Sequence, residues 1–281
     1  MEKIVHYFDN IPAWHRSVIL VAGLCFFWTL EGIFPLFRFS YNKIRHAGIN
    51  LLFTLTTLVV NFCLAYGIVW GSRYSQSHHS GLLELLAAPR WIRLMLGLLL
   101  LDFIGAWLIH WIEHKLKWLW KFHLVHHTDT WIDTTSANRH HPGESILRAS
   151  FTLLAVLITG APIWLVYCYQ TLSISCSQFN HANISLPEKL DKALRWIIVS
   201  PNMHKIHHHF TQPLTDTNYG NIFSCWDRLF GTYASVKDIN SLHYGIDTHM
   251  GEKENNHAAR LFKMPFEPFR PAPGSKFGRR G

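Results

Sequence analysis

The sequence predicts an all-α integral-membrane protein, a bundle of about four membrane-spanning helices with a cytosolic helical cap that holds a histidine-rich dimetal site. Hydrophobic residues make up 49% of the 281-residue chain and charged residues only 16%, a low share for a soluble protein. The apolar residues gather in long runs. The chain also has 20 histidines, many of them clustered in polar segments, and its mean hydropathy of only +0.08 requires a substantial polar part.

The first two apolar runs predict a membrane hairpin. Residues 17–37 contain one acid, Glu31, and are long enough to cross the hydrocarbon core of a bilayer. No small-residue cleavage site follows this run, which favours a retained helix over a signal peptide. The second run covers 48–71, and the short apolar stretch 81–88 after it predicts an interfacial segment.

The third and fourth runs complete the predicted bundle. The third, 92–111, contains Asp102 and continues directly into a histidine cluster. The fourth, 146–178, is too long for a single span and is interrupted by Gly-Ala-Pro at 160–162. Because proline cannot continue a helix, we expect two short helices there that enter the bilayer and return.

Loop charge predicts the orientation of the bundle. Basic residues follow the first run at Arg38, Lys43 and Arg45, and others follow the third run within 115–121. Both loops lie on the same face of the predicted bundle, and an excess of positive charge marks the cytosolic face. The loop 72–91 on the opposite face also carries arginines, so the charge difference between the faces is modest.

These patterns divide the chain into three segments. Residues 1–91 form the membrane hairpin and interfacial segment, and residues 92–249 form a histidine-rich domain. Residues 250–281 are rich in proline and glycine near their end and predict a tail with little order. The sequence contains no internal repeat.

Several classes of protein are excluded by composition. The net charge of +8 comes from lysines and arginines dispersed between apolar runs, which is not the pattern of a nucleic-acid-binding surface. The five cysteines include no CxxC pair and lie in or beside apolar stretches. A disulfide scaffold, a cysteine-based zinc site and an iron–sulfur cluster are therefore not expected.

Three histidine clusters predict a metal centre: HWIEH at 110–114, HLVHH at 123–127 and HKIHH at 204–208. Residues three or four apart share one face of a helix, so each cluster offers two or three imidazoles to one point. A lone histidine is normally a core or surface residue, but unpaired imidazoles are costly to bury and three clusters are hard to explain by packing. The eight candidate ligands are His110, His114, His123, His126, His127, His204, His207 and His208.

Ligand type and number favour two metal ions. Imidazole suits zinc, copper, iron and nickel, and eight histidines exceed the ligands of one tetrahedral zinc. The zinc-protease signature HExxH is absent, because Trp111 follows His110 and the acid of that cluster is Glu113.

These boxes, together with four further motifs, resemble the fatty acid hydroxylase/sterol desaturase superfamily of integral-membrane, di-iron, oxygen-dependent enzymes. The motifs are HPGE at 141–144, FNHAN at 179–183, NYG at 218–220 and WDRLFG at 226–231. The resemblance covers about residues 92–235, roughly half of the chain. It implies that 92–249 is a catalytic domain in which two iron ions activate O2 to attack an unactivated C–H bond.

The resemblance also implies the ligand set. The eight clustered histidines correspond to the family's boxes, and His181 and His141 are the next candidates. His140 and His209 adjoin matched positions but point elsewhere on a regular backbone. The remaining histidines have no spacing pattern and are expected to be interfacial or solvated; they are His6, His15, His46, His78, His79, His243, His249 and His257.

Acidic residues are candidates for orienting the ligands through hydrogen bonds to imidazole N–H groups. Asp102, about two turns before His110, is expected to orient His110 or His114, or to pair with another polar group. Glu31 is expected to pair with another polar group and not to orient a histidine. Other acids near the boxes are Glu113, Asp129, Asp133, Glu144, Asp216 and Asp227, of which Glu144 and Asp227 are the preferred candidates.

The leading hypothesis is a membrane di-iron oxygenase that hydroxylates a lipid, with desaturation as the neighbouring reaction. The chain has no dinucleotide fingerprint or haem-attachment motif, so a cytochrome b5-like or ferredoxin-type electron donor is expected. The main alternative is a histidine-rich metal transport or storage protein; a haem protein with paired histidines and a zinc hydrolase are others. The short N-terminal part and the lack of a retention signal favour the bacterial inner membrane over the endoplasmic reticulum. The substrate lipid and the oligomeric state stay open.

Overall fold

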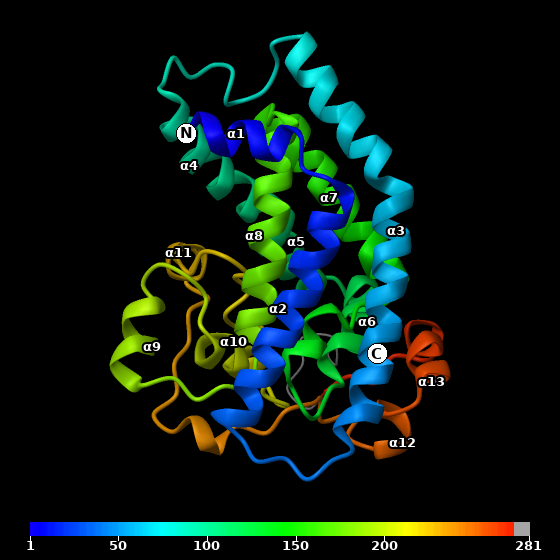
Figure 1. Ribbon diagram of the computed structural model, residues 1–281. Coiled ribbons are helices and arrows are strands. Elements are labelled where there is room, and N and C mark those ends of the chain that lie inside the picture. Colours follow the sequence, from blue (N-terminus) through cyan, green and yellow to red (C-terminus); the bar gives the residue numbers. More distant parts are fainter. Residues whose placement is uncertain (273–281) are drawn as a thin grey trace.

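The computed structural model describes residues 1–272, which form helices joined by loops, with no β-strand beyond three isolated β-bridges. Long helices form a bundle at one end of the molecule, and short helices and loops form a cap at the other end (Figure 1). The predicted all-α class is confirmed.

The bundle contains one short helix and five long segments. Its members are α1 (Glu2–Asp9), α2 (Ala13–Ile33), α3 (Lys43–Ser77), the continuous segment of α4 (Arg90–Asp102), η1 (Phe103–Leu108) and α5 (Ile109–Lys115), α7 (Pro142–Thr159) and α8 (Ile163–His181). The cap contains α6 (Lys117–His127), η2 (Thr134–Asn138), α9 (Glu188–Leu194), α10 (Pro201–His207), η3 (Leu214–Asp216), α11 (Cys225–Leu229), η4 (Ile239–Ser241), α12 (Glu252–Asn255), α13 (Ala258–Lys263) and η5 (Met264–Phe266).

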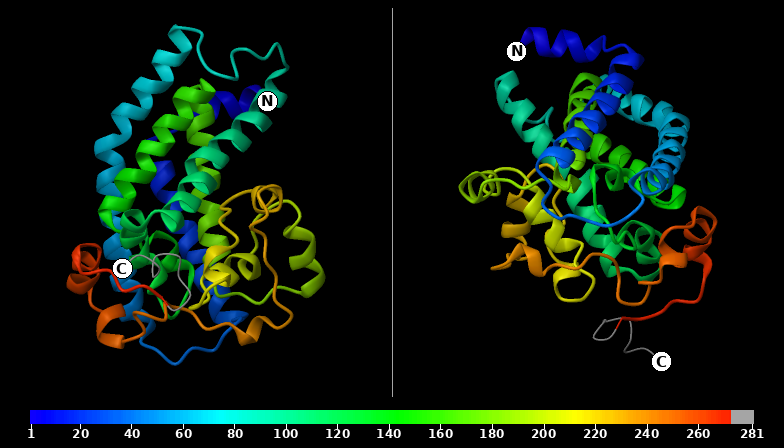
Figure 2. Two further views of the ribbon diagram at one scale, coloured as in Figure 1. Left: turned by 180° about the vertical axis from the view of Figure 1, so that it is seen from behind. Right: turned by 60° about the horizontal axis from the view of Figure 1, so that its bottom comes forward.

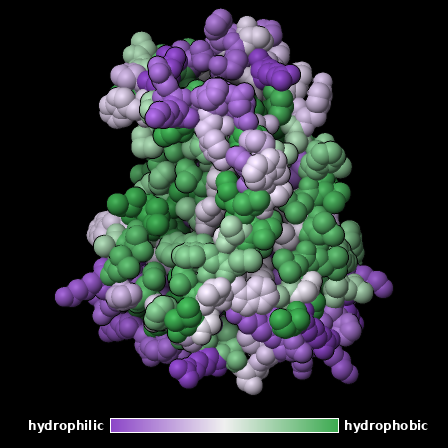
Figure 3. Space-filling view, viewed as in Figure 1, coloured by the Kyte–Doolittle hydropathy of each residue, from purple (hydrophilic) through white to green (hydrophobic). Residues whose placement is uncertain are grey.

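Four helical segments within residues 1–272 are long and apolar enough to cross a membrane, which confirms the predicted number: α2, α3, the α4–η1–α5 segment and α7. The outer faces of the bundle expose large apolar side chains, for example Leu55 and Phe62 on α3, which are 57% and 83% exposed. The face drawn in Figure 3 shows an apolar belt between two hydrophilic ends. A belt of this kind is stable where lipid, rather than water, surrounds it.

The predicted break in the fourth apolar run is confirmed at Gly160, which ends α7 in a left-handed conformation with φ of 67°. Pro162 then caps the N-terminus of α8, where its missing N–H costs nothing. The loop after α3 packs against this turn, since the amides of Leu82 and Leu83 donate to the carbonyls of Ile158 and Thr159. The two helices are not short, as had been expected: with 18 and 19 residues, α7 and α8 each extend about 27 Å, and α7 is long enough to cross a membrane.

Asp102 binds a distant loop rather than a histidine. Its carboxylate, which is fully buried, accepts the amides of Ile222 at 3.2 Å and Phe223 at 3.1 Å and the indole N–H of Trp226 at 3.2 Å. The expectation that Asp102 orients His110 or His114 is therefore wrong, and its alternative role of pairing with other polar groups holds. Glu31 likewise accepts the amides of Thr134 and Asn183.

The first part of the expected tail is ordered. Residues 252–266 form α12, α13 and η5 beside α6 and the cap end of α3 (Figure 2). Leu261 is fully buried in a cluster with Phe53 of α3 and Leu124 of α6, so apolar packing overrides the proline-rich composition. The rest of the predicted tail, 273–281, lies outside the described residues.

Candidate metal centre

Nine histidines converge in two adjoining groups inside the cap. The first group contains His110, His114, His123, His127 and His207, and the second contains His126, His181, His204 and His208. Within each group the candidate ligand nitrogens all lie within 4.8 Å of one another. The groups share a boundary, because the ring centroids of His127 and His208 are 4.8 Å apart. All nine side chains are buried.

Helical spacing places most of these rings. His110 and His114 are one turn apart on α5, and α6 presents His123 and His127 to the same group. His126, between them in sequence, points into the second group. On α10, His207 and His204 divide between the groups in the same way. His181 is the last residue of α8 and joins the second group.

Oxygen acceptors fix the tautomer of four rings. Each ring has its Nδ1 at hydrogen-bond distance from an oxygen that can only accept: His110 and the carbonyl of Tyr219 at 2.8 Å, His123 and Glu144 Oε1 at 2.8 Å, His181 and the carbonyl of Ser177 at 2.8 Å, and His207 and the carbonyl of Thr217 at 2.7 Å. Nδ1 must therefore carry the hydrogen. The lone pair of each neutral ring is left on Nε2, which faces into its group.

In the first group, two inward lone pairs face each other without a proton between them. The Nε2 atoms of His110 and His123 are 3.0 Å apart, although both rings donate through Nδ1. In the second group, the Nε2 lone pair of His181 points at Nε2 of His126, 3.2 Å away, and at Nε2 of His204, 3.1 Å away, and the Nδ1 atoms of those two rings have no hydrogen-bond partner among the described residues. Converging lone pairs repel unless a cation lies among them. The residues present therefore fit bound metal ions in both groups.

Burial favours the neutral, ligating form of the rings. It holds the pKa of each cap histidine in the two groups well below its ordinary value of 6.5, and neighbouring histidines lower it further. These histidines are His123, His126, His127, His204, His207 and His208. An imidazole that is already neutral binds a metal ion without first losing a proton.

A buried charge network supports the first group. Glu144 accepts from His123 and also from Arg148 Nε at 2.9 Å, as expected for a carboxylate that orients a ligand. Arg148 extends further to Glu113 at 2.6 Å, so the guanidinium joins two buried carboxylates. Asp216 contacts His114 Nδ1 at 3.1 Å.

Asp227 supports the histidines through a loop, and not through a direct hydrogen bond to a ring as expected. Its carboxylate accepts the amides of Tyr219 at 2.8 Å and Gly220 at 2.9 Å and the indole N–H of Trp107 at 2.9 Å. It contacts no histidine of the two groups. Instead it holds the loop whose Tyr219 carbonyl receives His110.

The structure does not bring His141 to either group. Its Nδ1 accepts from the amide of Gly143, where it caps α7, and its Nε2 lies 3.2 Å from the carbonyl of Phe262. Its neighbour His140 lies closer to the centre than expected: its ring stacks on His126 with centroids 4.7 Å apart, and its Nδ1 is 2.7 Å from Glu144. The spacing of four residues between His140 and Glu144 could have indicated this contact.

Two buried supporting residues were missed by the sequence reasoning. His46 was expected to be solvated, but it is 1% exposed and its Nε2 lies 2.8 Å from Asp129, two residues after His127. Lys205 is fully buried between His204 and His207 in sequence and donates to the carbonyls of His181 and Ala182. No sequence spacing signals either contact.

Comparison with known proteins identifies the domain that holds both groups. The profile of the fatty acid hydroxylase family matches residues 94–232, a range that includes all nine histidines. The chain belongs to the fatty acid hydroxylase family. The family assignment implied by the histidine boxes is thereby confirmed. No solved structure gives a significant match.

Relatives of this fatty acid hydroxylase domain are lipid-modifying enzymes by name. An ornithine lipid hydroxylase, OlsE, of Rhizobium tropici is 25% identical over 56% of this chain and 46% of its own length. An alkylglycerol monooxygenase of Danio rerio is 28% identical over 54% of this chain and 32% of its own length. A cholesterol 25-hydroxylase-like protein of the same fish is 24% identical over 50% of each chain. The match thus spans half or less of each relative.

Glu144 offers a test of ligand support in the fatty acid hydroxylase domain. We expect Glu144→Gln to weaken metal binding about 10–100-fold, because glutamine gives His123 and Arg148 a weaker, neutral acceptor. Equilibrium dialysis against a metal buffer measures the affinity. Glu188→Gln is the matched control, since Glu188 is exposed on α9 and pairs with Lys192. Equal affinities in the two variants would contradict the role of Glu144.

Proposed function

We propose that this protein is a membrane-bound non-haem di-iron oxygenase that hydroxylates an aliphatic C–H bond of a lipid, using O2 and electrons from outside the chain. The observation that carries the proposal is the pair of buried all-histidine groups inside a fatty acid hydroxylase domain, at one end of an apolar helical bundle. The names of the relatives support a lipid as the substrate.

All nine histidines would act as ligands, five for one metal ion and four for the other. Two bound iron ions would supply the redox chemistry that activates O2 toward an unactivated C–H bond. A wholly imidazole shell is neutral, so it would not offset the positive charge of the bound ions. The overall reaction consumes the lipid C–H, one O2, two electrons and two protons, and yields the alcohol and water.

The chain's own residues would orient the ligands and exclude water. Glu144 and the carbonyls of Tyr219 and Thr217 hold their rings with Nε2 inward. The nine rings are at most 6% exposed, so bulk water is kept from the site. The apolar bundle would let a lipid chain approach the cap from the bilayer.

The electron donor would dock on the cytosolic face of the cap. Lys117 is exposed there and Lys115 and Lys121 are half-buried around it, beside the junction of α5 and α6, the two helices that carry four histidines of the first group. A cytochrome b5-like or ferredoxin-type protein with an acidic docking surface suits this charge. Positive charge on the cap side also supports a cytosolic metal site. The membrane that we propose is a bacterial inner membrane.

Oxygen uptake and lipid mass spectrometry together test the proposal. The purified, iron-loaded protein is supplied with a reductant, O2 and a lipid extract. We expect reductant-dependent oxygen uptake and a lipid product that has gained one oxygen atom. A product that has lost two hydrogens would instead identify a desaturase. No oxygen uptake beyond that of the zinc-loaded protein would overturn the proposal, and iron flux in proteoliposomes would then support the transport alternative.

A further inference from the structure

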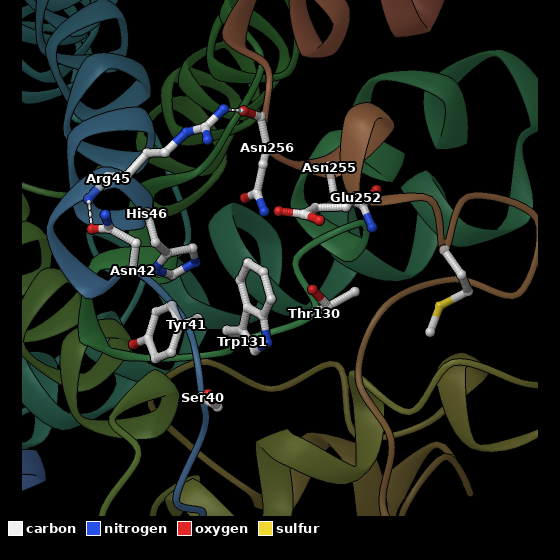
Figure 4. Close-up of a pocket in the computed structure, with 11 residues that line it drawn as sticks. Ser40, Tyr41, Asn42, Arg45, His46, Thr130, Trp131, Glu252, Asn255 and Asn256 are labelled. Carbon is white, nitrogen blue, oxygen red and sulfur yellow. Dashed lines mark hydrogen bonds between the residues drawn. The ribbon is translucent and has the colours of Figure 1, made fainter.

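A polar cavity of about 440 Å³ opens beside the first turn of α3, and none of the nine histidines lines it. Its size lies within the range of ligand pockets. Figure 4 shows Arg45 of α3 on one side, Glu252 and Asn256 of the C-terminal segment across from it, and the ring of Trp131 between them. We call it the α3–α12 cavity.

The α3–α12 cavity lies at the depth of lipid headgroups. The side chains from Leu51 to Trp70 on α3 include many exposed apolar ones, and these 20 residues cover about 30 Å, the thickness of a hydrocarbon core. Trp70 suits one interface of the bilayer, as tryptophan commonly does. Arg45 precedes Leu51 by six residues, or about 9 Å, which places it just outside the other interface.

The cavity wall contains a polar side chain with no partner. Asn255 lines the cavity and is 2% exposed, and neither its Nδ2 nor its Oδ1 makes a hydrogen bond among the described residues. A buried amide without partners is unfavourable, so such a group points to a ligand that supplies both an acceptor and a donor. The amide of Asn256 lies beside it in the same wall.

Opposite charges line opposite sides of the cavity. The guanidinium of Arg45 makes one long hydrogen bond, 3.4 Å to the carbonyl of Asn256, and no ion pair within residues 1–272. Glu252 is exposed and likewise forms no ion pair in the part of the chain that the structure describes. Between them, Trp131 stacks on Tyr41 with centroids 5.1 Å apart, which leaves an aromatic face to contact a cation.

We propose that the α3–α12 cavity binds the headgroup of a zwitterionic lipid. The anionic group of the lipid pairs with Arg45, its ammonium lies between Glu252 and the face of Trp131, and a carbonyl or hydroxyl contacts Asn255. The inference rests on the proposed function in taking this lipid as the substrate. Trp131 follows His127 by only four residues, so a headgroup held here lies next to the metal-binding helix α6.

Direct binding measurements test the site without turnover. The full-length, metal-loaded protein in detergent is titrated with dioleoyl phosphatidylethanolamine, with the anionic dioleoyl phosphatidylglycerol and with a cationic dioleoyl lipid, and binding is read by native mass spectrometry. We expect the zwitterionic lipid to bind about tenfold more tightly than either of the others. Arg45→Gln and Glu252→Gln should each remove that preference. Lys253→Gln, at an exposed neighbour that does not line the cavity, should keep it.

Charge exchange gives a second test of the assignment. The single change Arg45→Glu should select the cationic lipid. Adding Glu252→Arg to it should restore zwitterion binding, since the headgroup can then bind in the reverse direction. Equal affinity for all three lipids, or unchanged affinities in the variants, would overturn the site.

Three further outcomes separate this inference from related ones. If soluble glycerophosphoethanolamine bound as tightly as the lipid, the ligand would be a free metabolite and the lipid assignment would be wrong. If zwitterion binding were intact but no lipid were oxidised, the proposed function would fail while the headgroup site stood. If the variants lost binding and kept wild-type KM for the oxidised lipid, the site would not serve the substrate.

Discussion

If the proposed two-ion centre forms, the variant His204→Ala is expected to bind one metal ion instead of two, and to lose at least about 100-fold in activity. His204 belongs to the four-histidine group, which would fall to three ligands. Loss of a supporting hydrogen bond alone typically costs 10–100-fold in metal affinity or activity, so loss of a ligand costs more. Elemental analysis of the purified variant gives the ratio of metal to protein.

Two neighbours of His204 provide matched comparisons. His207→Ala removes one ligand from the five-histidine group, which keeps four, so this variant should retain more metal than His204→Ala. His209→Ala alters a residue outside both groups, whose Nδ1 instead receives the amide of His243, and it should retain two ions. Loss of an ion in His209→Ala, or two ions in His204→Ala, would contradict the assignment of ligands.

Asp227→Ala is expected to destabilise the fold by about 3–5 kcal/mol. The carboxylate is fully buried and accepts from Trp107, Tyr219, Gly220 and the hydroxyl of Thr232. Alanine leaves these four donors without their acceptor, and a buried unsatisfied donor costs about 1–3 kcal/mol before the loop relaxes. The midpoint of thermal unfolding in detergent measures the effect.

Two other aspartate changes calibrate that result. Asp227→Asn keeps one acceptor oxygen and should fall between the wild type and Asp227→Ala. Asp238→Ala removes an exposed aspartate that caps the short helix η4, and it should cost no more than about 1 kcal/mol. Equal unfolding midpoints for Asp227→Ala and Asp238→Ala would show that Asp227 does not hold the Tyr219 loop.

Local periodicity explains what the sequence could predict. The four membrane candidates follow from long apolar runs, and the convergence of His110 with His114, or of His123 with His127, follows from helical spacing alone. The break at Gly160 could be predicted because its cause, the Gly-Ala-Pro sequence at 160–162, is local. These features depend on contacts within one helix or turn.

Long-range contacts explain the features that the sequence could not predict. Asp102 bonds Ile222 across 120 positions, and His46 bonds Asp129 across 83, so neither partner leaves a spacing pattern. His141 has the right residue type beside a matched motif, yet its ring nitrogens are engaged at the start of α7 and at the carbonyl of Phe262. Composition predicted a poorly ordered tail at α13, and this prediction was wrong. Leu261 packs there against residues of α3 and α6 that precede it by more than 100 positions.

The position of α13 has a consequence for biogenesis. Arg139, fully buried behind α6, donates to the carbonyl of Asn255, and Leu261 closes the apolar cluster around Leu124. Both contacts can form only after residues 255–261 have been synthesised, which is later than all nine histidines. We therefore expect the packing around α6 to be completed after the histidine-bearing segments have left the ribosome.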